Sequence, residues 1–424
     1  MKNAPLNINK YLNPEEESKS QKLQNPVREQ YDQIIGGQGR YSSMCDWFNY
    51  PANQGIADLE TIQEKLDPIK KNYDSVVVIG VGGSYLGVRA IYELFKHQTN
   101  ISMHFAGWHL SGLEFSQFLK EIEGKSPLLI VISKSGTTLE PAVHFRHLME
   151  WMKDKYHNDY QKRVVIITDP EKGALRKFAD DNDIINFSVP AGIGGRYSVL
   201  SPVGMVPLIC GNIAVEKIMS GASIVYEEMI AKQYQQSMTD YISMRHMCWN
   251  SQRQVECMIF DEPAYEYFAG WWQQLFGESE GKNKKGLFPV TSLITKDLHS
   301  LGQFFQEGTP IFFETFVRFN STPNNIEVKR LNGFADGYDS LVAKKFDQLN
   351  TVATDSTIKA HHENGHVPIC EIIVNSLDEF SVGYMLSFFK VAAAVSAAMF
   401  DVDPFNQPGV EFYKKYMKEK LPQL

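Results

Sequence analysis

Short runs of β-branched and other apolar residues recur along the first half of the chain, each after a segment with helical character. They cover residues 76–79, 128–132, 164–168 and 184–189. Each run is apolar at successive positions, so both faces of the predicted strand would be buried. The spacings fit β–α–β crossovers, which connect parallel strands. We therefore predict a parallel sheet covered by helices on both sides, with functional loops at the carboxyl ends of its strands.

The second half of the chain continues the alternation of strand and helix. Strands are predicted at residues 257–260, 311–319 and 369–374, and a helix at 265–276. A chain of 424 residues is longer than one hydrophobic core usually supports. The pattern therefore predicts a second α/β domain.

The remaining boundaries follow from changes in this pattern. Residues 202–249 are rich in helix formers, and a last helix is predicted at 410–420. The expected organisation is an N-terminal arm (1–40), a first α/β domain (41–201), a helical connection (202–249), a second α/β domain (250–400) and a C-terminal helix (401–424).

The composition of the chain argues against nucleic-acid and membrane partners. The net charge of -8 provides no basic field for a phosphate backbone, which argues against nucleic acid. The five cysteines are scattered and form no C-x-x-C pair, so we expect reduced thiols. The first residues contain no apolar signal region, and the most apolar stretch, VAAAVSAAMF, is about half the length of a membrane span. We expect a cytoplasmic protein with no membrane partner.

A glycine-rich loop follows the first predicted strand, in the stretch VVVIGVGGSYLG. Gly80, Gly82 and Gly83 would expose backbone N–H groups, and Ser84 is expected to cap the next helix. A dinucleotide-binding loop needs G-x-G-x-x-G, but Tyr85 stands at the third glycine position, and no acid ends the predicted strand at 101–106. An anion-binding loop and a plain tight turn both remain open.

A second loop, SKSGTT at residues 133–138, follows the next strand and precedes Glu140 and Pro141, which open a helix. Four hydroxyls, one ammonium and one glycine match the oxygens of a phosphate monoester. The order of a nucleotide-binding P-loop is missing, so no triphosphate is implied. The alternative is a solvated Ser/Thr turn.

One motif points to different chemistry. Residues 362–366 satisfy H-E-x-x-H, the zinc protease pattern, which requires both histidines on one face of a regular helix. Gly365 is unfavourable in a helix by about 1 kcal/mol, and Pro368 ends it soon after. We interpret the match as accidental and expect no metal. The basic run at Lys282, Lys284 and Lys285 is interpreted as a solvated loop.

Two such loops on successive parallel strands resemble the sugar isomerase (SIS) fold. The segments GIGGRYSVLSPVG, FGESEGK, TKDLHSLGQ and FNQPGVEFYKK each resemble a signature stretch of glucose-6-phosphate isomerases, in the same order. The resemblance spans residues 76–415 and is strongest to the compact bacterial branch. It implies two sugar isomerase domains, each a parallel-sheet α/β sandwich, with a helical N-terminal arm and a C-terminal helix.

The resemblance also implies site residues. Glu278 matches the catalytic base, His299 the ring-opening residue, and Arg196 and Lys414 further catalytic positions. Substrate-binding positions are matched by Gly83, Ser84, Ser133, Lys134, Ser135, Thr137, Thr138, Gln274 and Gln407. Glu280 stands where the family more often has Asn. Two carboxylates therefore lie two residues apart, and alignment alone selects Glu278 over Glu280.

The implied reaction is a cofactor-free aldose–ketose isomerisation between glucose 6-phosphate and fructose 6-phosphate, in glycolysis and gluconeogenesis. A carboxylate would move the proton through an enediolate, and a histidine would open the sugar ring. The family further implies a homodimer in which His299 reaches the partner's site. A sugar-phosphate-binding regulator is the rival, although no basic DNA-reading segment is visible. Activity on mannose 6-phosphate remains open.

Overall fold

The computed structural model describes residues 5–35, 44–233, 235–323 and 325–423. Its first sheet has the order β3-β2-β4-β5-β6, and all its strands are parallel. The strands are β2 (Ser75–Ile79), β3 (Ser102–Ala106), β4 (Pro127–Ile132), β5 (Val164–Thr168) and β6 (Ile185–Ser188). Every residue of β2, β4 and β5 is buried, as expected for strands covered on both sides. The four runs predicted in this half are confirmed as strands.

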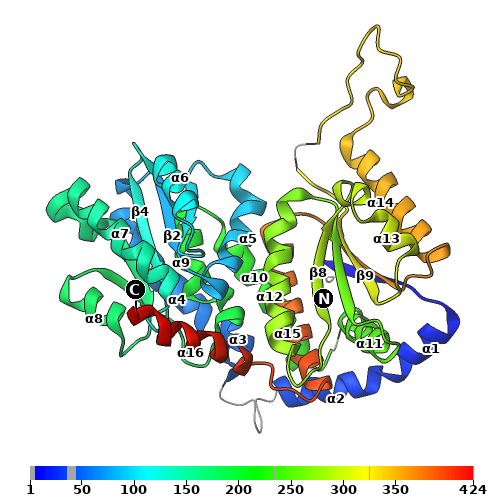
Figure 1. The fold of residues 1–424 in the computed structure, drawn as a ribbon, viewed down its shortest axis with the longest axis horizontal. Helices are drawn as coiled ribbons and strands as arrows, with labels where there is room; N and C mark the ends of the chain where they lie inside the picture. Colours follow the sequence, from blue (N-terminus) through cyan, green and yellow to red (C-terminus); the bar gives the residue numbers. More distant parts are fainter. Residues whose placement is uncertain (1–4, 36–43, 234, 324, 424) are drawn as a thin grey trace.

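Helices cover both faces of this sheet (Figure 1). The outer face packs against α6 (Gly112–Ile122), α7 (Leu139–Tyr156) and α8 (Ala174–Asp181). The inner face packs against α4 (Gln54–Leu66), α5 (Leu86–Phe95) and α9 (Pro202–Cys210), which belong to the main core, and the short α3 (Asp46–Asn49) lies nearby.

The second sheet has the order β1-β10-β9-β7-β8. Four strands are parallel: β7 (Val255–Phe260), β8 (Phe288–Leu293), β9 (Phe312–Phe319) and β10 (Ile369–Val374). The three strands predicted here are confirmed. Strand β8 was not predicted, because its sequence FPVTSL contains a proline and only one β-branched aliphatic residue. The outer face of this sheet packs against α13 (Gly302–Glu307) and α14 (Phe346–Glu363).

The N-terminal segment differs from the expected arm. Its described part begins with β1 (Leu6–Tyr11), which pairs antiparallel with β10 at the edge of the second sheet. The helices α1 (Pro14–Lys22) and α2 (Gln24–Ile35) follow and pack on α11 (Gln236–Asn250), with α2 also on α15. The polar sequence LNINKY carries a weak strand pattern, because an edge strand buries little of itself. The segment therefore completes the second sheet from the opposite end of the chain.

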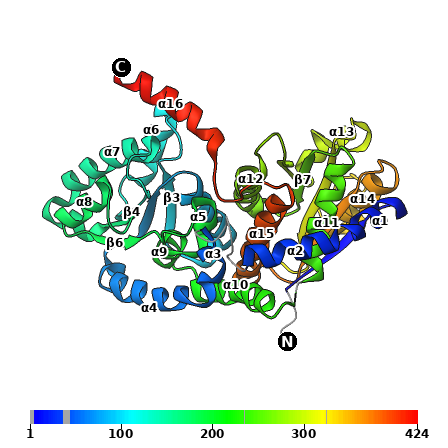
Figure 2. The same cartoon turned by 90° about the horizontal axis from the view of Figure 1, so that it is seen from below.

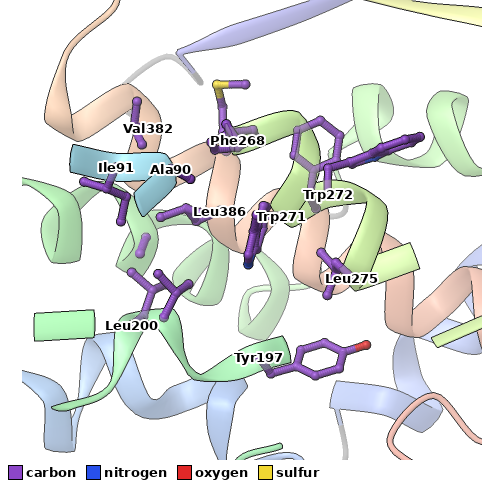
Figure 3. Packing of buried hydrophobic residues seen from close by; sticks show 14 of the residues in the cluster. Ala90, Ile91, Tyr197, Leu200, Phe268, Trp271, Trp272, Leu275, Val382 and Leu386 are labelled. Atoms are coloured by element: carbon purple, nitrogen blue, oxygen red, sulfur yellow. The ribbon is translucent and has the colours of Figure 1, made fainter. Parts of the chain in front are cut away.

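Three helices pack between the two sheets: α10 (Val215–Ile230), α12 (Glu266–Glu280) and α15 (Glu379–Met399) (Figures 1 and 2). Figure 3 shows how side chains of α12 meet those of its neighbours: Phe268, Trp271, Trp272 and Leu275 from α12, Ala90 and Ile91 from α5, Val382 and Leu386 from α15, and Tyr197 and Leu200. Helix α15 is the one described helix long and apolar enough to cross a membrane, and 94% of its most apolar window is buried inside the protein. It is the central core helix.

Two segments stand apart from the core. The connection between β9 and α14 projects from the second lobe as a long extension (Figure 1). Helix α16 (Glu411–Lys420) contains no buried residue, and Figure 2 shows it projecting outward from the molecule on the side of the first lobe.

Candidate active site

A cavity of about 880 Å³ lies at the carboxyl ends of the first sheet, facing the end of α12 and the C-terminal segment. Both predicted loops line it. The sequence-predicted residues on its wall are Gly83, Ser84, Ser133, Lys134, Ser135, Thr138, Arg196, Gln274, Glu278, Gln407 and Lys414. Residues more than 300 positions apart in sequence thus meet in one cavity of a size typical for small-molecule sites.

The glycine loop follows β2 and lies against the segment that carries Arg196. Gly82 has a left-handed backbone with φ of 57°. A Cβ at Gly83 would come within 2.1 Å of the Gly195 carbonyl oxygen, so only glycine permits this approach. Ser84 does not cap the next helix as expected, because α5 begins at Leu86 after a short 3-10 turn that includes Ser84. Its side chain is left on the cavity wall.

The serine loop follows β4 and leads into α7. Within it, the Gly136 N–H donates to Ser133 Oγ at 3.1 Å, and the Thr137 N–H donates to Ser135 Oγ at 3.2 Å. Thr138 precedes the first residue of α7, and its side chain makes no capping bond. The positive end of an 18-residue helix therefore meets several hydroxyls at the cavity, which is an arrangement suited to an anion.

A third loop, after β5, also reaches the cavity, and the sequence analysis missed it. Asp169, Lys172 and Gly173 line the wall. Asp169 Oδ1 accepts the N–H groups of Glu171 and Lys172 at 3.0 and 3.1 Å, and these backbone bonds hold the pKa of Asp169 below its usual value. Its position after a predicted parallel strand could have indicated this loop, because the carboxyl ends of all parallel strands lie at the same edge of a sheet.

The Glu278 carboxylate lies at the end of α12 and is one-third exposed. Gln274, one helical turn earlier, donates from Nε2 to Glu278 Oε1 at 3.0 Å. Arg196 donates from Nη1 to the other oxygen, Oε2, at 3.2 Å. Gln274 Oε1 is buried and has no hydrogen-bond partner among the described residues, so it can accept a hydrogen bond from a ligand hydroxyl.

Arg196 is almost completely buried and connects three parts of the chain. Its Nε donates to Ser279 Oγ at 3.0 Å, and Nη1 also donates to Gln407 Oε1 at 2.7 Å. Its Nη2 donates to the carbonyl oxygens of Pro404 and Asn406. A buried guanidinium with all five donors bound is rigid, and it places a fixed positive charge beside Glu278.

The two carboxylates of ESEGK have opposite surroundings. Glu278 borders the cavity, whereas Glu280 is fully buried on the far side of α12. Both Glu280 oxygens accept hydrogen bonds from Arg245, at 2.5 and 3.2 Å. Of the two, Glu278 alone can meet a ligand in this cavity.

The C-terminal segment closes one side of the cavity. Lys282 donates from Nζ to the Ser279 and Asp403 carbonyl oxygens, which ties the end of α12 to this segment. Burial and the nearby Arg196 lower the Lys282 pKa to about 8. Lys414, on α16, lines the cavity and donates to Glu411 Oε1 at 2.7 Å. Tyr413 and Val410 also line it, although the sequence analysis did not select them.

Two predicted site residues lie elsewhere. Thr137 belongs to the serine loop but is not among the residues of the cavity wall. His299 is exposed in a short 3-10 turn, Lys296–His299, after β8, and does not line the cavity of its own chain.

The H-E-x-x-H pattern does not form a helical pair. Helix α14 ends at Glu363, and His366 has a left-handed backbone with φ of 52°. His362 and His366 therefore do not share one helix face. Over the part of the chain that the structure describes, no three His, Cys, Asp or Glu residues are grouped so as to hold a metal ion.

The arrangement suits one type of chemistry. The cavity offers hydroxyls and a helix N-terminus to an anion, and its lining also includes a carboxylate beside a fixed guanidinium. A carboxylate of this kind can remove a proton next to a carbonyl, and the guanidinium can stabilise the resulting negative oxygen.

Comparisons with known proteins agree with this geometry. The family described as phosphoglucose isomerase matches residues 68–424. A glucose-6-phosphate isomerase of Staphylococcus epidermidis is 40% identical over 398 residues, covering 92% of this chain and 90% of that protein. The crystal structure of a hypothetical protein from Thermus thermophilus has a TM-score of 0.88 at 23% identity, covering 98% of this chain and 99% of that one. A glucose-6-phosphate isomerase structure from Chlamydia trachomatis has a TM-score of 0.77 at 19% identity, covering 95% and 86% of the two chains. The shared fold confirms the predicted fold class.

Proposed function

Because this chain belongs to the phosphoglucose isomerase family, we propose that it interconverts glucose 6-phosphate and fructose 6-phosphate without a cofactor. The observation that carries the proposal is the Glu278 carboxylate, held by Gln274 and Arg196 in the cavity that the serine loop also lines. A proton-transferring group and a phosphate-binding loop thus face the same space. The family's reaction requires both.

Glu278 acts as the base. It removes the proton from carbon 2 of the open-chain aldose, which leaves an enediolate intermediate. The same carboxyl group then returns the proton to carbon 1, which gives the ketose. Gln274 and Arg196 bind one carboxylate oxygen each, which holds the group in place for both transfers. The free Gln274 Oε1 accepts a sugar hydroxyl.

Arg196 stabilises the enediolate. Its Nη1 lies between Glu278 Oε2 and Gln407 Oε1, so the charge is placed next to the base before the reaction begins. Its five N–H groups are already bound within the protein, so Arg196 acts through its fixed positive charge rather than through a new hydrogen bond. Gln407 and Lys414 complete this side of the site.

The phosphate binds at the serine loop. Ser133, Lys134, Ser135 and Thr138 provide hydroxyls, an ammonium and helix-end N–H groups, and Gly83 and Ser84 contact the sugar. Thr137 lies in the same loop but not on the cavity wall, and it supports the loop through its N–H bond to Ser135 Oγ. Lys172, which lines the same cavity, adds a further positive charge.

Ring opening requires His299, and we propose that it comes from a partner subunit in a homodimer. Two exposed apolar side chains that follow His299 closely in the chain, Leu301 and Phe304, support this assignment. The extension between β9 and α14 also exposes apolar side chains, including Leu331, Phe334 and Tyr338. Burial of such surfaces against a second copy would bring His299 into the partner's cavity.

The cellular setting is also a proposal. We place the protein in the cytoplasm, in glycolysis and gluconeogenesis, with no nucleic-acid or membrane partner. The acidic net charge supports this setting. We further propose residues 41–201 and 250–400 as its two sugar isomerase domains.

The proposed activity is tested with a coupled assay of glucose 6-phosphate and fructose 6-phosphate interconversion in the presence of EDTA. We expect turnover in both directions. A sugar-phosphate-binding regulator would bind both sugars without converting them, and this result would contradict the proposal. Mannose 6-phosphate in the same assay measures specificity at carbon 2.

A further inference from the structure

A buried ion-pair network lies behind the end of α12, on the side away from the cavity. Glu280 follows Glu278 by two residues, which places it about 200° further around the helix. Glu280 and its partner Arg245 are essentially inaccessible to solvent. Neither residue touches the cavity.

Arg245, on α11, joins three other elements through directional bonds. It binds both Glu280 oxygens as a fork, and its Nε donates to Glu256 Oε2 on β7 at 2.6 Å. Its Nη1 also donates to Ser396 Oγ on α15 at 2.6 Å. Glu256 Oε1 in turn accepts from Thr315 on β9 at 2.8 Å. The end of α12 is thereby connected to the second sheet and to the central helix.

Stability alone is a poor explanation for this network. Two buried carboxylates share one guanidinium, so the group carries a net negative charge where desolvation is costly. Apolar side chains of similar volume often stabilise a core as well or better. A fork of hydrogen bonds differs from apolar packing because it specifies the position and the orientation of the groups that it joins.

The last turn of α12 needs such a constraint. Helix ends fray because their final carbonyl groups have no partner within the helix, and Glu278 lies only two residues from the end. Each of the three last residues is held by a side chain from another element. Arg196 binds Glu278 and Ser279 from the cavity side, and Arg245 binds Glu280 from behind.

We propose that Arg245 and Glu280 are positioning residues: their buried ion pair fixes the rotation of the last turn of α12 and so aims the Glu278 carboxylate at the reacting carbons. The role in aiming the base rests on the proposed isomerase function. The anchoring of the helix end does not depend on it.

The test substitution is Glu280→Gln, which keeps the shape but turns an amide NH₂ toward a guanidinium donor. We expect kcat to fall about 10- to 100-fold with KM changed less than about threefold, because the base is displaced while the phosphate site is intact. Exchange of the carbon 2 hydrogen with solvent should increase per turnover, since a misaimed base holds its proton longer. Arg245→Lys, which keeps the charge and loses the fork, is the second variant if Glu280→Gln does not fold.

The matched control is Glu314→Gln. Glu314 is also fully buried, and it pairs with His361 at 2.9 Å on the opposite face of the same sheet. We expect this variant to lower the unfolding midpoint but to keep the wild-type kcat per folded molecule and the wild-type exchange ratio. If the loss of any buried ion pair were enough to lower kcat, both variants would show the same fall in kcat.

Amide hydrogen exchange of the folded protein gives a readout that needs no turnover. The backbone at residues 277–281 should exchange faster in Glu280→Gln and at the wild-type rate in Glu314→Gln. An unchanged rate there, or faster exchange with wild-type kcat and exchange ratio, overturns the proposal. A wild-type protein that does not isomerise sugar phosphates contradicts the proposed function instead, and amide exchange still decides whether the pair anchors the helix.

Discussion

At the scale of single residues, two side chains of the same type can have different roles because their surroundings in the folded protein differ. Glu278 and Glu280 have the same chemistry, yet one borders a cavity and the other is enclosed by a guanidinium. A general base must be able to reach its substrate and exchange its proton. Position on the helix therefore decides the proposed roles.

Replacing Glu278 by Gln should lower kcat by several orders of magnitude and change KM by only a few-fold, because a neutral amide cannot accept the carbon 2 proton. Hydrogen exchange at carbon 2 should disappear with it. Steady-state kinetics and exchange measured by NMR check both effects. Glu266→Gln, at the exposed start of the same helix, is the control and should behave as wild type. Appreciable turnover by Glu278→Gln would assign the base elsewhere.

Lys390, on α15, is a buried lysine whose amino group donates a hydrogen bond to the Tyr197 carbonyl oxygen at 3.5 Å. Burial lowers its pKa to about 7 from an ordinary value of 10.5. Between pH 7 and 10.5 the unfolded chain binds this proton and the folded chain does not. This group therefore makes the protein more stable as pH rises through that window, by up to about 1.4 kcal/mol per pH unit.

We expect Lys390→Met to raise the free energy of unfolding at pH 7–8, because no proton has to be released on folding. The advantage over wild type should shrink toward pH 10. Urea unfolding of both proteins at pH 7, 8, 9 and 10 measures the difference. Stability curves that stay parallel across this range would show that Lys390 is charged in the folded protein.

At the scale of elements, the glycine and serine loops both reach the cavity because each connects a buried parallel strand to the start of a helix. β4 and α7 hold the serine loop in place, and the backbone N–H groups of Gly136 and Thr137 fix its shape by donating to the hydroxyl oxygens of Ser133 and Ser135. The strand and the helix are determined by local pattern, and the loop between them is thereby directed to the edge of the sheet.

Replacing Ser135 and Thr138 together by Ala should raise KM about 10-fold or more with a smaller change in kcat, because phosphate contacts are shared by ground and transition states. Inorganic phosphate should also inhibit the variant less. Ser116→Ala, an exposed serine of α6 in the same lobe, serves as the control. A collapse of kcat at unchanged KM would contradict a phosphate-binding role for this loop.

At the scale of the whole molecule, the proposed site is incomplete in one chain, because His299 lies outside its own cavity. In a two-fold dimer each site would take Glu278 from one subunit and His299 from the other. Leu301 and Phe304, which follow His299 in the chain, and apolar side chains of the β9–α14 extension are exposed, and the proposed dimer would bury them.

Mixing Glu278→Gln with His299→Ala should restore activity to two inactive variants. In the heterodimer one site carries both defects and the other carries none, so random reassembly predicts about a quarter of wild-type activity. The subunits must first be unfolded and refolded together, because a large apolar interface exchanges slowly. Purified heterodimers carrying two different tags provide the direct measurement. If they are inactive, His299 acts within its own chain or has no catalytic role.

Much of the architecture was predictable because it depends on local pattern. Buried β-branched runs predicted most strands of both sheets, and their parallel arrangement placed the glycine and serine loops at one edge. The polar edge strand β1 and the proline-containing β8 were missed, because their strand character comes from pairing with distant neighbours. The short signature segments predicted the candidate site residues through family resemblance rather than through any local physical property.

The sequence by itself therefore determined the α/β alternation, the positions of the glycine and serine loops and the family, because each depends on residues close together in the chain. Tertiary structure alone decided which side chains share an environment. It brought Arg196 against residues 404–407, enclosed Glu280 with Arg245, and left His299 on an exposed surface. These outcomes depend on partners that lie 35 to 211 positions away, and no local pattern of apolar and polar residues records such distances.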